Sequence, residues 1–476
     1  MSCMSGVCTP TAKSAVLNVT DLQNMLASGS VKVTTSALTN DIKVQAALTW
    51  ASANALTLDA RRSIIVDQSV SVAGTGGLTL TTNDGSTTGD LTFGPSGNVS
   101  FLGTSNPLTI NGNAYTLENS ISALAAAIAA SPGGRYALAN SYDASKDGTY
   151  SKSPIGTPVK GTIEGLGNTI SNLGVSSKYN SVALIASLAI PGLLRDLTVA
   201  DADIRVNGKF SGQGQVAAVV ASNSGIILNS HSSGSVTCSN LADAGGLAGY
   251  SPGTILNSHS SVAVNASSCP EAGGLVGFAH SIKSSYATGP VSASAVAGGI
   301  AGSFTFGEIS QSYATGAVTG GSVSGDQGVT VGGLIGNMQG GKLSNSYATG
   351  SVAGGSGAYV GGLLGNLIPA VGSVTVISSY ATGPVTTGAG GYVGGLIGFD
   401  SSNAGSISDC YWDITTSGIT NLAQGAGNVG NDPGITGLTT TQLQSGLPVG
   451  FSSSVWGEKS TINDGLPYLW KFPPAS

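Results

Sequence analysis

A tandem repeat constrains this chain more than any other feature of its sequence. The motif Gly-Gly-[Leu/Ile]-x-Gly recurs at intervals of 25 to 34 residues, beginning at Gly245, Gly273, Gly298, Gly332, Gly361 and Gly394. A second motif, Ser-Tyr-Ala-Thr-Gly-x-Val, alternates with the first and is intact at Ser285, Ser312, Ser346 and Ser379. Repeats of this length are typical of solenoids, in which each repeat packs only against its neighbours.

The composition of the repeat selects the kind of solenoid. Glycine contributes 73 of 476 residues, and charged residues make up only 8% of the chain. Glycine and β-branched residues are poor helix formers, which excludes helical repeats, and propeller blades need about 40 residues or more. The pattern therefore predicts an all-β fold, a right-handed parallel β-helix (solenoid) with short capping helices. Each coil, meaning one turn of this helix, would hold three short strands.

Strand alternation assigns a direction to the side chains of the second motif. Ser, Ala and Val fall on one face, which we expect to point inward, and Tyr and Thr fall on the other. The outward column then reads His231, His259, Tyr286, Tyr313, Tyr347, Tyr380 and Tyr411. An exposed column of this kind makes Tyr286, Tyr313, Tyr347 and Tyr380 candidate ligand-binding residues for the flat faces of sugars. The simpler interpretation is that the rings stack only to stabilise the solenoid.

Four segments follow from the distribution of these patterns. Residues 1–30 are predicted as an N-terminal cap with a helix over Thr20–Leu26, because the open end of a β-helix must be covered. Residues 31–175 are predicted as divergent coils with a short helix near residues 120–130. Residues 176–432 are the repeat region, and residues 433–476 are predicted as a C-terminal cap containing Trp456 and Trp470.

Charge and cysteine usage exclude several classes of partner and cofactor. The net charge is −6 and the pI is about 4.9, so no basic surface is expected for nucleic acid. No apolar run approaches the roughly 18 residues of a membrane span. The five cysteines form no Cys-x-x-Cys or Cys/His cluster, so we expect no zinc, no other metal and no cofactor. Their odd number rules out complete pairing, and we expect mostly free, buried thiols.

Asp243 and Glu271 form the one carboxylate pair that could perform catalysis. Each stands two residues before its Gly-Gly, so the two side chains should lie about 5 Å apart on adjacent coils, as in retaining glycosidases. The same position elsewhere holds Gln215, Val296, Thr330, Tyr359 and Tyr392, which indicates a variable turn. We therefore favour no catalytic role for the pair, and no metal role for His231 and His259.

The alternating Gly-Gly-Leu-x-Gly and Ser-Tyr-Ala-Thr-Gly units resemble the GLUG-type repeat of bacterial surface proteins. The N-terminal third is similar to the passenger region of filamentous-haemagglutinin-like exoproteins and adhesins. The resemblance implies a β-helical stalk on the outer surface of a Gram-negative bacterium or outside it, and carries no catalytic residues. The secretion-domain motif of such exoproteins is not evident here, so we expect a fragment of a longer exoprotein or another export signal.

Three functional hypotheses follow. The first is a secreted or cell-surface stalk or adhesin, non-catalytic, whose partners are a glycan, a host surface or a matrix. The second is a polysaccharide-active β-helix enzyme, a lyase or glycoside hydrolase, which would need a groove lined by acids and a Lys or Arg. The third is a self-associating fibre subunit. It rests on the apolar residues at positions three and four of Gly-Gly-[Leu/Ile]-x-Gly, one of which strand alternation would expose for lateral association unless a turn intervenes.

Overall fold

The computed structural model describes residues 1–85, 88–179, 181–208, 213–239, 242–322 and 328–474. Strands account for 45% of the chain and helices for 7%, which confirms the all-β class. The chain divides into two compact units: residues 1–144, 159–171 and 192–198 form unit 1, and residues 145–158, 172–191 and 199–476 form unit 2. The predicted boundary at residue 175 falls inside the stretch where the two units alternate along the chain.

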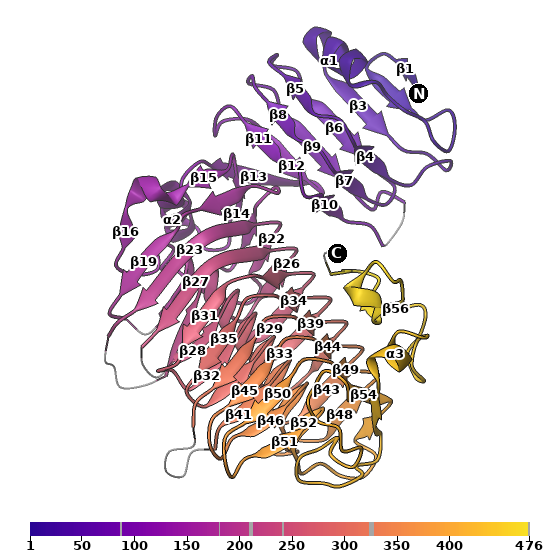
Figure 1. Ribbon diagram of the computed structural model, residues 1–476. Helices are drawn as coiled ribbons and strands as arrows, with labels where there is room; N and C mark the ends of the chain where they lie inside the picture. The colour runs from indigo at the N-terminus through magenta and orange to yellow at the C-terminus, as the bar shows by residue number, and fades with distance from the viewer. Residues whose placement is uncertain (86–87, 180, 209–212, 240–241, 323–327, 475–476) are drawn as a thin grey trace. The chain divides into compact units, whose positions relative to one another are not determined.

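Unit 1 begins with three sheets of parallel strands (Figure 1). Each passage of the chain adds one strand to each sheet, in register with the passage before. The first sheet contains β3 (Val31–Thr34), β6 (Leu56–Asp59), β9 (Leu78–Thr81) and β12 (Leu108–Ile110). The second contains β4 (Ile42–Val44), β7 (Ile64–Val66) and β10 (Leu91–Phe93), and the third β5 (Leu48–Trp50), β8 (Val70–Val72) and β11 (Val99–Phe101).

The N-terminal residues cover the first of these strands. β1 (Ser2–Met4) and β2 (Val7–Thr9) form an antiparallel hairpin joined by a Cys3–Cys8 disulfide, and β2 pairs with β3. Helix α1 (Val19–Ser28) begins one residue before the predicted segment, because the side chain of Asn18, not of Thr20, caps it. The helix buries Leu22 and Leu26 in the unit 1 core, which is what a cap requires.

The run of coils predicted over residues 31–175 is interrupted by a hairpin. β12 turns into the antiparallel β13 (Asn113–Glu118) through Asn111 and Gly112, both of which have positive φ. Asn-Gly is the preferred pair for such a two-residue turn, so the hairpin could have been predicted from the sequence. The prediction of an uninterrupted run of coils was wrong here. Helix α2 (Ile121–Ala130), capped by Ser120, follows as predicted. Beyond it come β14 (Arg135–Leu138), β15 (Tyr142–Asp143), β17 (Thr162–Glu164), β18 (Thr169–Ser171) and β22 (Leu193–Arg195).

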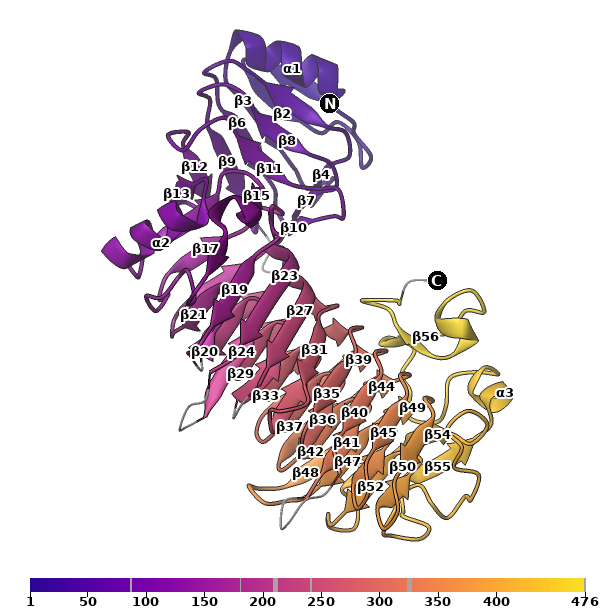
Figure 2. The same cartoon turned by 60° about the vertical axis from the view of Figure 1, so that its left-hand side comes forward.

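Unit 2 is also built from three long parallel sheets, best followed in Figure 2. The tyrosine sheet contains β16 (Thr149–Tyr150), β19 (Gly174–Ser177), β23 (Thr198–Val206), β27 (His231–Cys238), β30 (His259–Ser260), β31 (Ala263–Ala266), β34 (Tyr286–Ala287), β35 (Val291–Ala293), β39 (Tyr313–Ala314), β40 (Val318–Gly320), β44 (Tyr347–Ala348), β45 (Val352–Gly354), β49 (Tyr380–Ala381), β50 (Val385–Thr387), β54 (Cys410–Asp413) and β55 (Ile435–Leu438). The glycine sheet contains β20 (Ser181–Val182), β24 (Gly214–Ala217), β28 (Ala242–Gly245), β32 (Glu271–Gly273), β36 (Val296–Gly298), β41 (Thr330–Gly332), β46 (Tyr359–Gly361) and β51 (Tyr392–Gly394).

The third sheet follows the glycine sheet in every repeat. It contains β21 (Ile185–Leu188), β25 (Val220–Asn223), β26 (Ile226–Leu228), β29 (Ala248–Leu256), β33 (Val276–Lys283), β37 (Ala301–Phe304), β38 (Glu308–Ser310), β42 (Ile335–Met338), β43 (Gly341–Ser344), β47 (Leu364–Leu367), β48 (Val374–Ile377), β52 (Ile397–Asp400) and β53 (Ile407–Ser408).

The register within these sheets confirms the predicted alignment of the two motifs. The first glycines of the six Gly-Gly pairs stand opposite one another on successive strands, from Gly245 to Gly394. The column from His231 to Tyr411 is aligned in the same way. The chain thus returns to the same three sheets in each repeat, an arrangement compatible with a parallel β-helix.

The corner before each tyrosine depends on a left-handed residue followed by a serine. The corner residues, with φ near 50°, are Asn229, Asn257, Ser284, Gln311, Asn345, Ser378 and Asp409. At the next position Ser312 donates its hydroxyl to the carbonyl oxygen of Ser310, and its backbone N–H donates to the Ser346 hydroxyl of the next coil. The serines therefore satisfy buried backbone groups that a bend in the chain would otherwise leave unpaired. Cys410 occupies this serine position in the last copy.

The Gly-Gly pair is required by the turn between the glycine sheet and the third sheet. An added Cβ at Gly332 would lie 2.0 Å from the carbonyl oxygen of Ile335, and at Gly333 it would lie 2.0 Å from that of Gly362. Because the chain turns here, positions three and four of the motif, such as Leu334 and Ile335, are both fully buried. The apolar column expected to point outward for lateral association is therefore absent from the described repeats, and that prediction was wrong.

The C-terminal residues do not form the predicted end cap around Trp456 and Trp470. Residues 439–474, called the C-terminal segment below, contain α3 (Thr440–Leu443), β56 (Trp456–Gly457), the 3₁₀ turn Asn463–Gly465 and β57 (Tyr468–Leu469). This segment, yellow in Figure 1, lies beside β39, β44 and β49 of the tyrosine sheet in both views. Trp456 packs against tyrosines of that sheet, and Trp470 is exposed.

Four of the five cysteines are paired, which corrects the prediction of mostly free thiols. Besides Cys3–Cys8, a disulfide joins Cys238 to Cys269, 31 residues further along the chain. Cys238 ends β27 and Cys269 follows β31, which pairs with β27, so one repeat separates the two cysteines. Cys410 is a buried free thiol. The spacing of one repeat between the two cysteines could have predicted this pairing, which the number of cysteines alone does not indicate.

Candidate functional site

The tyrosine column forms a continuous stack of rings, as predicted. Ring centroids of Tyr286, Tyr313, Tyr347 and Tyr380 follow one another at 4.8, 4.8 and 5.1 Å with nearly parallel planes. His231 and His259 extend the stack at 3.7 Å from each other, and His259 lies 4.4 Å from Tyr286. This spacing is that of neighbouring strands, so the pairing of β-strands sets the stack.

The C-terminal segment covers this column, so the prediction that it is exposed was wrong. Tyr313, Tyr347 and Tyr380 are at most 2% exposed and form one apolar cluster with Phe451, Trp456 and Leu469. The Tyr380 hydroxyl donates to the carbonyl oxygen of Pro467 and accepts from the side chain of Asn463. These three rings cannot reach a ligand while the segment is in place.

Tyr286 and the two histidines lie at the other end of the column and are partly buried. Phe472 of the C-terminal segment approaches Tyr286, with ring centroids 5.9 Å apart. Burial lowers the pKa of His231 to about 4 and, together with the neighbouring His231, lowers the pKa of His259 to about 3. Both rings are therefore neutral at physiological pH, which suits stacking rather than proton transfer.

Asp243 and Glu271 lie opposite each other on β28 and β32, which confirms that they occupy adjacent coils. Their column is a strand position and not the turn that its variability suggested. The Gln213 amide donates to both carboxylate oxygens of Asp243, and one oxygen of Glu271 is buried without a hydrogen-bond partner. Burial raises the pKa of Asp243 to about 6, and burial followed by the charge of Asp243 raises the pKa of Glu271 to about 7.

A raised pKa is what a general acid needs, but Asp243 lacks access to a substrate and Glu271 is only partly exposed. Asp243 is 1% exposed, and a carboxyl group must contact the glycosidic oxygen in order to protonate it. Burial is the largest cause of both pKa shifts, and no basic side chain lowers either pKa. The repeat alone explains why the two carboxyl groups lie opposite each other. The burial of Asp243 does not favour hydrolysis of a polysaccharide.

Two groups of accessible aromatic rings were missed from the sequence. The first, called the Tyr392 cluster, contains Tyr359, Tyr392 and Phe399: Tyr359 stacks on Phe399 at 4.7 Å, and Tyr392 meets Phe399 edge-on at 5.4 Å. Tyr392 is 43% exposed. Tyr359 and Tyr392 belong to the Asp243 column, and Phe399 to the first strand after the Gly-Gly turn. The turn therefore brings outward side chains of two sheets together.

The second group is the Phe306 cluster, formed by Tyr250, Phe278, His280 and Phe306. Successive ring centroids lie 5.3, 5.7 and 5.6 Å apart, and Phe306 is 49% exposed. Tyr250 and Phe278 occupy the same column as Phe399, since all three pair through Ser303, Asn337 and Asn366. Aligning this third column of the repeat would have revealed the aromatic residues at its two ends.

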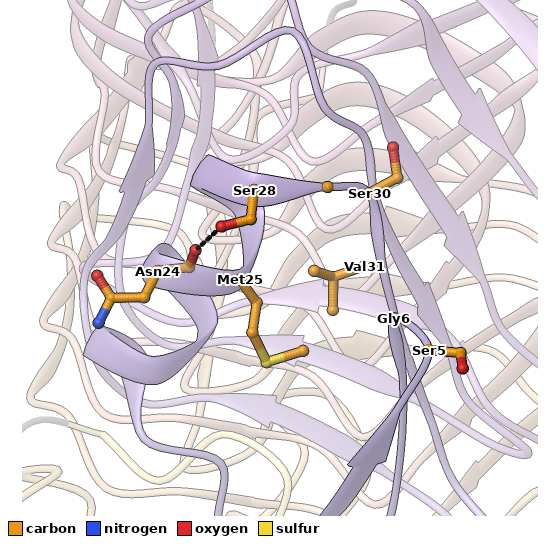
Figure 3. Close-up of a pocket in the computed structure, with 8 residues that line it drawn as sticks. Ser5, Gly6, Asn24, Met25, Ser28, Ser30 and Val31 are labelled. Carbon is orange, nitrogen blue, oxygen red and sulfur yellow. Dashed lines mark hydrogen bonds between the residues drawn. The ribbon is translucent and has the colours of Figure 1, made fainter.

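A cavity of about 540 Å³ lies in unit 1 between α1 and the first hairpin (Figure 3). Its lining side chains are polar or apolar but uncharged, among them Ser5, Asn24, Met25 and Val31. Ser28 donates its hydroxyl to the carbonyl oxygen of Asn24 within the helix, as Figure 3 shows. The cavity therefore offers hydrogen bonds, but its described lining has no acid or base that could activate a serine hydroxyl.

No three His, Cys, Asp or Glu side chains gather as a metal-binding group in the part of the chain that the structure describes. No helix among the described residues is both long and apolar enough to cross a membrane.

Comparison with known families supports the resemblance drawn from the repeats. A family profile described as "The GLUG motif" matches residues 327–353. This stretch contains the Gly-Gly turn at Gly332 and the Ser346–Val352 motif, which lie on β41–β45. Comparison with curated proteins gives no match. The match supports a GLUG-repeat protein, and the other Gly-Gly motifs from Gly245 to Gly394 stand in register with the one it covers.

Proposed function

We propose that this chain is an extracellular, right-handed β-helical stalk or adhesin of a Gram-negative bacterium, that it is not an enzyme, and that its exposed aromatic clusters bind glycan. The stalk role rests on the in-register stacking of the coils in unit 2. Each coil contacts the next through three paired strands and a serine hydrogen bond. A force that pulls neighbouring coils apart is therefore opposed by many backbone hydrogen bonds at once.

The disulfides support a location outside the cytoplasm. Cys3–Cys8 and Cys238–Cys269 would be reduced in a cytosol and persist in oxidising compartments. The Cys238–Cys269 bond closes a loop of about one coil, which stabilises such a protein by about 2–4 kcal/mol. Labelling intact cells of a producing strain with an antibody against unit 2 tests this location. Signal obtained only after the cells are permeabilised would contradict it.

The single observation that carries the binding proposal is the exposure of the Tyr392 cluster. Its rings are held in fixed directions by their mutual contacts, so little side-chain entropy would be lost when a sugar ring stacks on them. Aromatic faces with a polar edge suit the apolar face and the hydroxyl rim of a pyranose. Tyr313, Tyr347 and Tyr380 are not proposed as binding residues, because the C-terminal segment covers them.

Binding of the intact chain to a glycan array, followed by titration with the best oligosaccharide, tests the proposal. Tyr392→Ala and Tyr359→Ala should each weaken binding by about tenfold, which corresponds to about 1.4 kcal/mol. Tyr179→Ala is the matched control, because Tyr179 is 54% exposed and is not part of either aromatic cluster. An affinity unchanged by all three variants, or lowered equally by all three, would remove this surface as the site.

Polysaccharide cleavage is tested on the same preparation. The double variant Asp243→Asn/Glu271→Gln keeps the size and shape of both side chains and removes both acids. We expect no polysaccharide-cleaving activity in the parent chain. A cleaving activity that this double variant abolishes would replace the stalk proposal with the enzyme hypothesis.

A further inference from the structure

Asp400 stands where the preceding coils carry large apolar side chains. In the third sheet, Phe304, Met338 and Leu367 follow one another in register and are fully buried, and Asp400 is the next member of this column. Asp400 is itself 7% exposed. Burying a carboxylate in an apolar column is costly unless a hydrogen bond, a proton or a cation compensates for the lost hydration.

Asp432 approaches Asp400 from a different part of the chain. Asn428 fixes the approach, because its amide donates to the Asp400 carbonyl oxygen at 2.7 Å and accepts the Asp400 N–H at 2.7 Å. Asp432 is 9% exposed, and its Oδ2 atom is buried without a hydrogen-bond partner. Among the ion pairs of the described residues, none involves either carboxylate.

The two carboxylates share a cavity of about 190 Å³. The other polar side chains that line it, Ser402 and Asn403, also offer oxygen atoms. Ser402 donates its backbone N–H to one oxygen of Asp400, which leaves the second oxygen of that carboxylate for another partner. A volume of this size holds an ion with several water molecules, since one water occupies about 30 Å³.

We propose that Asp400, the last residue of β52, and Asp432, in the loop before β55, form a calcium site. Ca²⁺ takes six to eight oxygen ligands in a flexible geometry, and carboxylates, side-chain amides, hydroxyls and water all serve. Nitrogen and sulfur donors, which zinc and copper prefer, are absent from the described lining. The ion would neutralise the two carboxylates and strengthen the contact of β52 with the loop before β55, which already includes the bridge between Ile397 and Ala426 and the hydrogen bonds of Asn428.

The competing occupant is a proton. Burial, then a side-chain hydrogen bond with Asp400 and the charge of Asp400, raise the pKa of Asp432 to about 7, so the pair could share a proton near neutral pH. The two occupants make opposite predictions above this pKa: a protonated pair loses its proton and becomes unstable, whereas a calcium site gains affinity as both groups ionise.

Calorimetric titration of the intact, chelator-treated chain with CaCl₂ at about pH 8 tests the proposal, with MgCl₂ titrated in parallel. We expect one Ca²⁺ per chain with Kd of about 1 mM or tighter, a range found in extracellular modules. We also expect a rise in melting temperature with Ca²⁺. Mg²⁺ should bind at least about tenfold more weakly, because it demands a tighter octahedral shell.

Two variants separate the calcium site from a general charge effect. Asp432→Asn should weaken Ca²⁺ binding at least about tenfold, and without Ca²⁺ its melting temperature should equal or exceed that of the parent, since repulsion between the carboxylates is removed. Asp464→Asn removes the same charge from an exposed residue and should bind Ca²⁺ like the parent. A folded parent chain that binds no Ca²⁺ up to about 10 mM, or one whose affinity Asp432→Asn leaves unchanged, overturns the proposal.

Discussion

The tyrosine column and the Asp243 column are two outward positions of the same repeat, yet they differ in variability and in exposure. The first holds His or Tyr in every coil from His231 to Tyr411, and its central rings lie under the C-terminal segment. The second holds Gln, Asp, Glu, Val, Thr and Tyr, and ends at the exposed Tyr392. Both columns run across paired strands, which lie about 4.8 Å apart.

The difference suggests why one column of a repeat keeps the same residue type in every coil and another does not. A column must keep one residue type where another part of the chain packs against all its members, because each ring then fits a fixed neighbour. The described members of the Asp243 column share no such partner and range from the buried Asp243 and Thr330 to the exposed Tyr392, so this column is free to vary and a single coil can acquire an exposed residue. Uniform tyrosines were therefore a sign of an internal contact, whereas the aromatic residues of the variable column are the ones that a ligand can reach.

The largest effect that would break this comparison is loss of the contact made by Trp456. Trp456→Ala should lower the free energy of unfolding of unit 2 by about 3–5 kcal/mol, because it empties a buried site between Tyr347, Tyr380 and Phe451. Urea denaturation measures the change. Trp470→Ala, at a site 55% exposed, is the control and should cost less than about 1 kcal/mol. Equal effects of the two variants would mean that the segment does not cover the tyrosine column.

In the Asp243 column, Glu271→Gln should stabilise the protein and do so only at high pH. The pKa of Glu271 in the folded chain is about 7, above its ordinary value of 4.5, so the folded state binds the proton more tightly than the unfolded state. The contribution of Glu271 to the free energy of unfolding is thus fully present below about pH 4.5 and is lost as the pH rises through about 7. Glutamine removes this loss, and the gain should grow from zero near pH 4 to about 3 kcal/mol near pH 9.

The measurement is urea denaturation of both proteins across that pH range, with Glu308→Gln as the control. Glu308 pairs with Lys342 at 3.1 Å, and the hydrogen bonds and charge of this pair lower its pKa against the opposing effect of burial. Its replacement should therefore give no gain at high pH. A gain of similar size at pH 4 would show that the effect of Glu271→Gln is not electrostatic.

Removing single hydroxyl groups should distinguish neighbouring members of the tyrosine column. Tyr380→Phe should cost about 1–3 kcal/mol, because it leaves the Pro467 carbonyl and the Asn463 amide with one partner fewer in a buried site. The Tyr347 hydroxyl is buried and has no hydrogen-bond partner, so Tyr347→Phe should be neutral or slightly stabilising. Melting temperatures of the two variants test this order, and the reverse order would contradict the assigned contacts.

The smallest effect concerns the histidine end of the column, and its sign is opposite to that of Glu271. Because the pKa of His259 is lowered to about 3, the unfolded state binds the proton more tightly, and stability is lost as the pH falls below about 6.5. Between pH 7.5 and 5.5 this residue alone should cost about 1 kcal/mol. His259→Tyr, which continues the stack from Tyr286, should abolish that loss, as followed by urea denaturation. An unchanged slope would place the acid-sensitive group elsewhere.

Much of the fold could be predicted because the repeat imposes it locally. The glycine turn, the serine after each corner and the inward valines each satisfy a requirement within one coil and its neighbours, so the register of Gly245–Gly394 and of Tyr286–Tyr380 could be predicted from spacing. The predictions that failed concern features that occur once. The Asn111-Gly112 hairpin interrupts the coils once, and the Cys238–Cys269 bond joins two cysteines that lie one repeat apart but have no counterparts in the other repeats.

The sequence by itself determined that strands stack in parallel, which residues share a column and, away from the Gly-Gly turn, which side of a strand a residue occupies. These properties follow from the two-residue period of a strand and from turns that only glycine or a left-handed residue can make. Only the tertiary structure decided which outward column is accessible. The burial of Tyr347 depends on Trp456, more than a hundred positions away, and the pairing of Asp400 with Asp432 depends on a loop with no repeat of its own. No periodicity encodes such contacts, because they form between a repeating surface and a segment that occurs once.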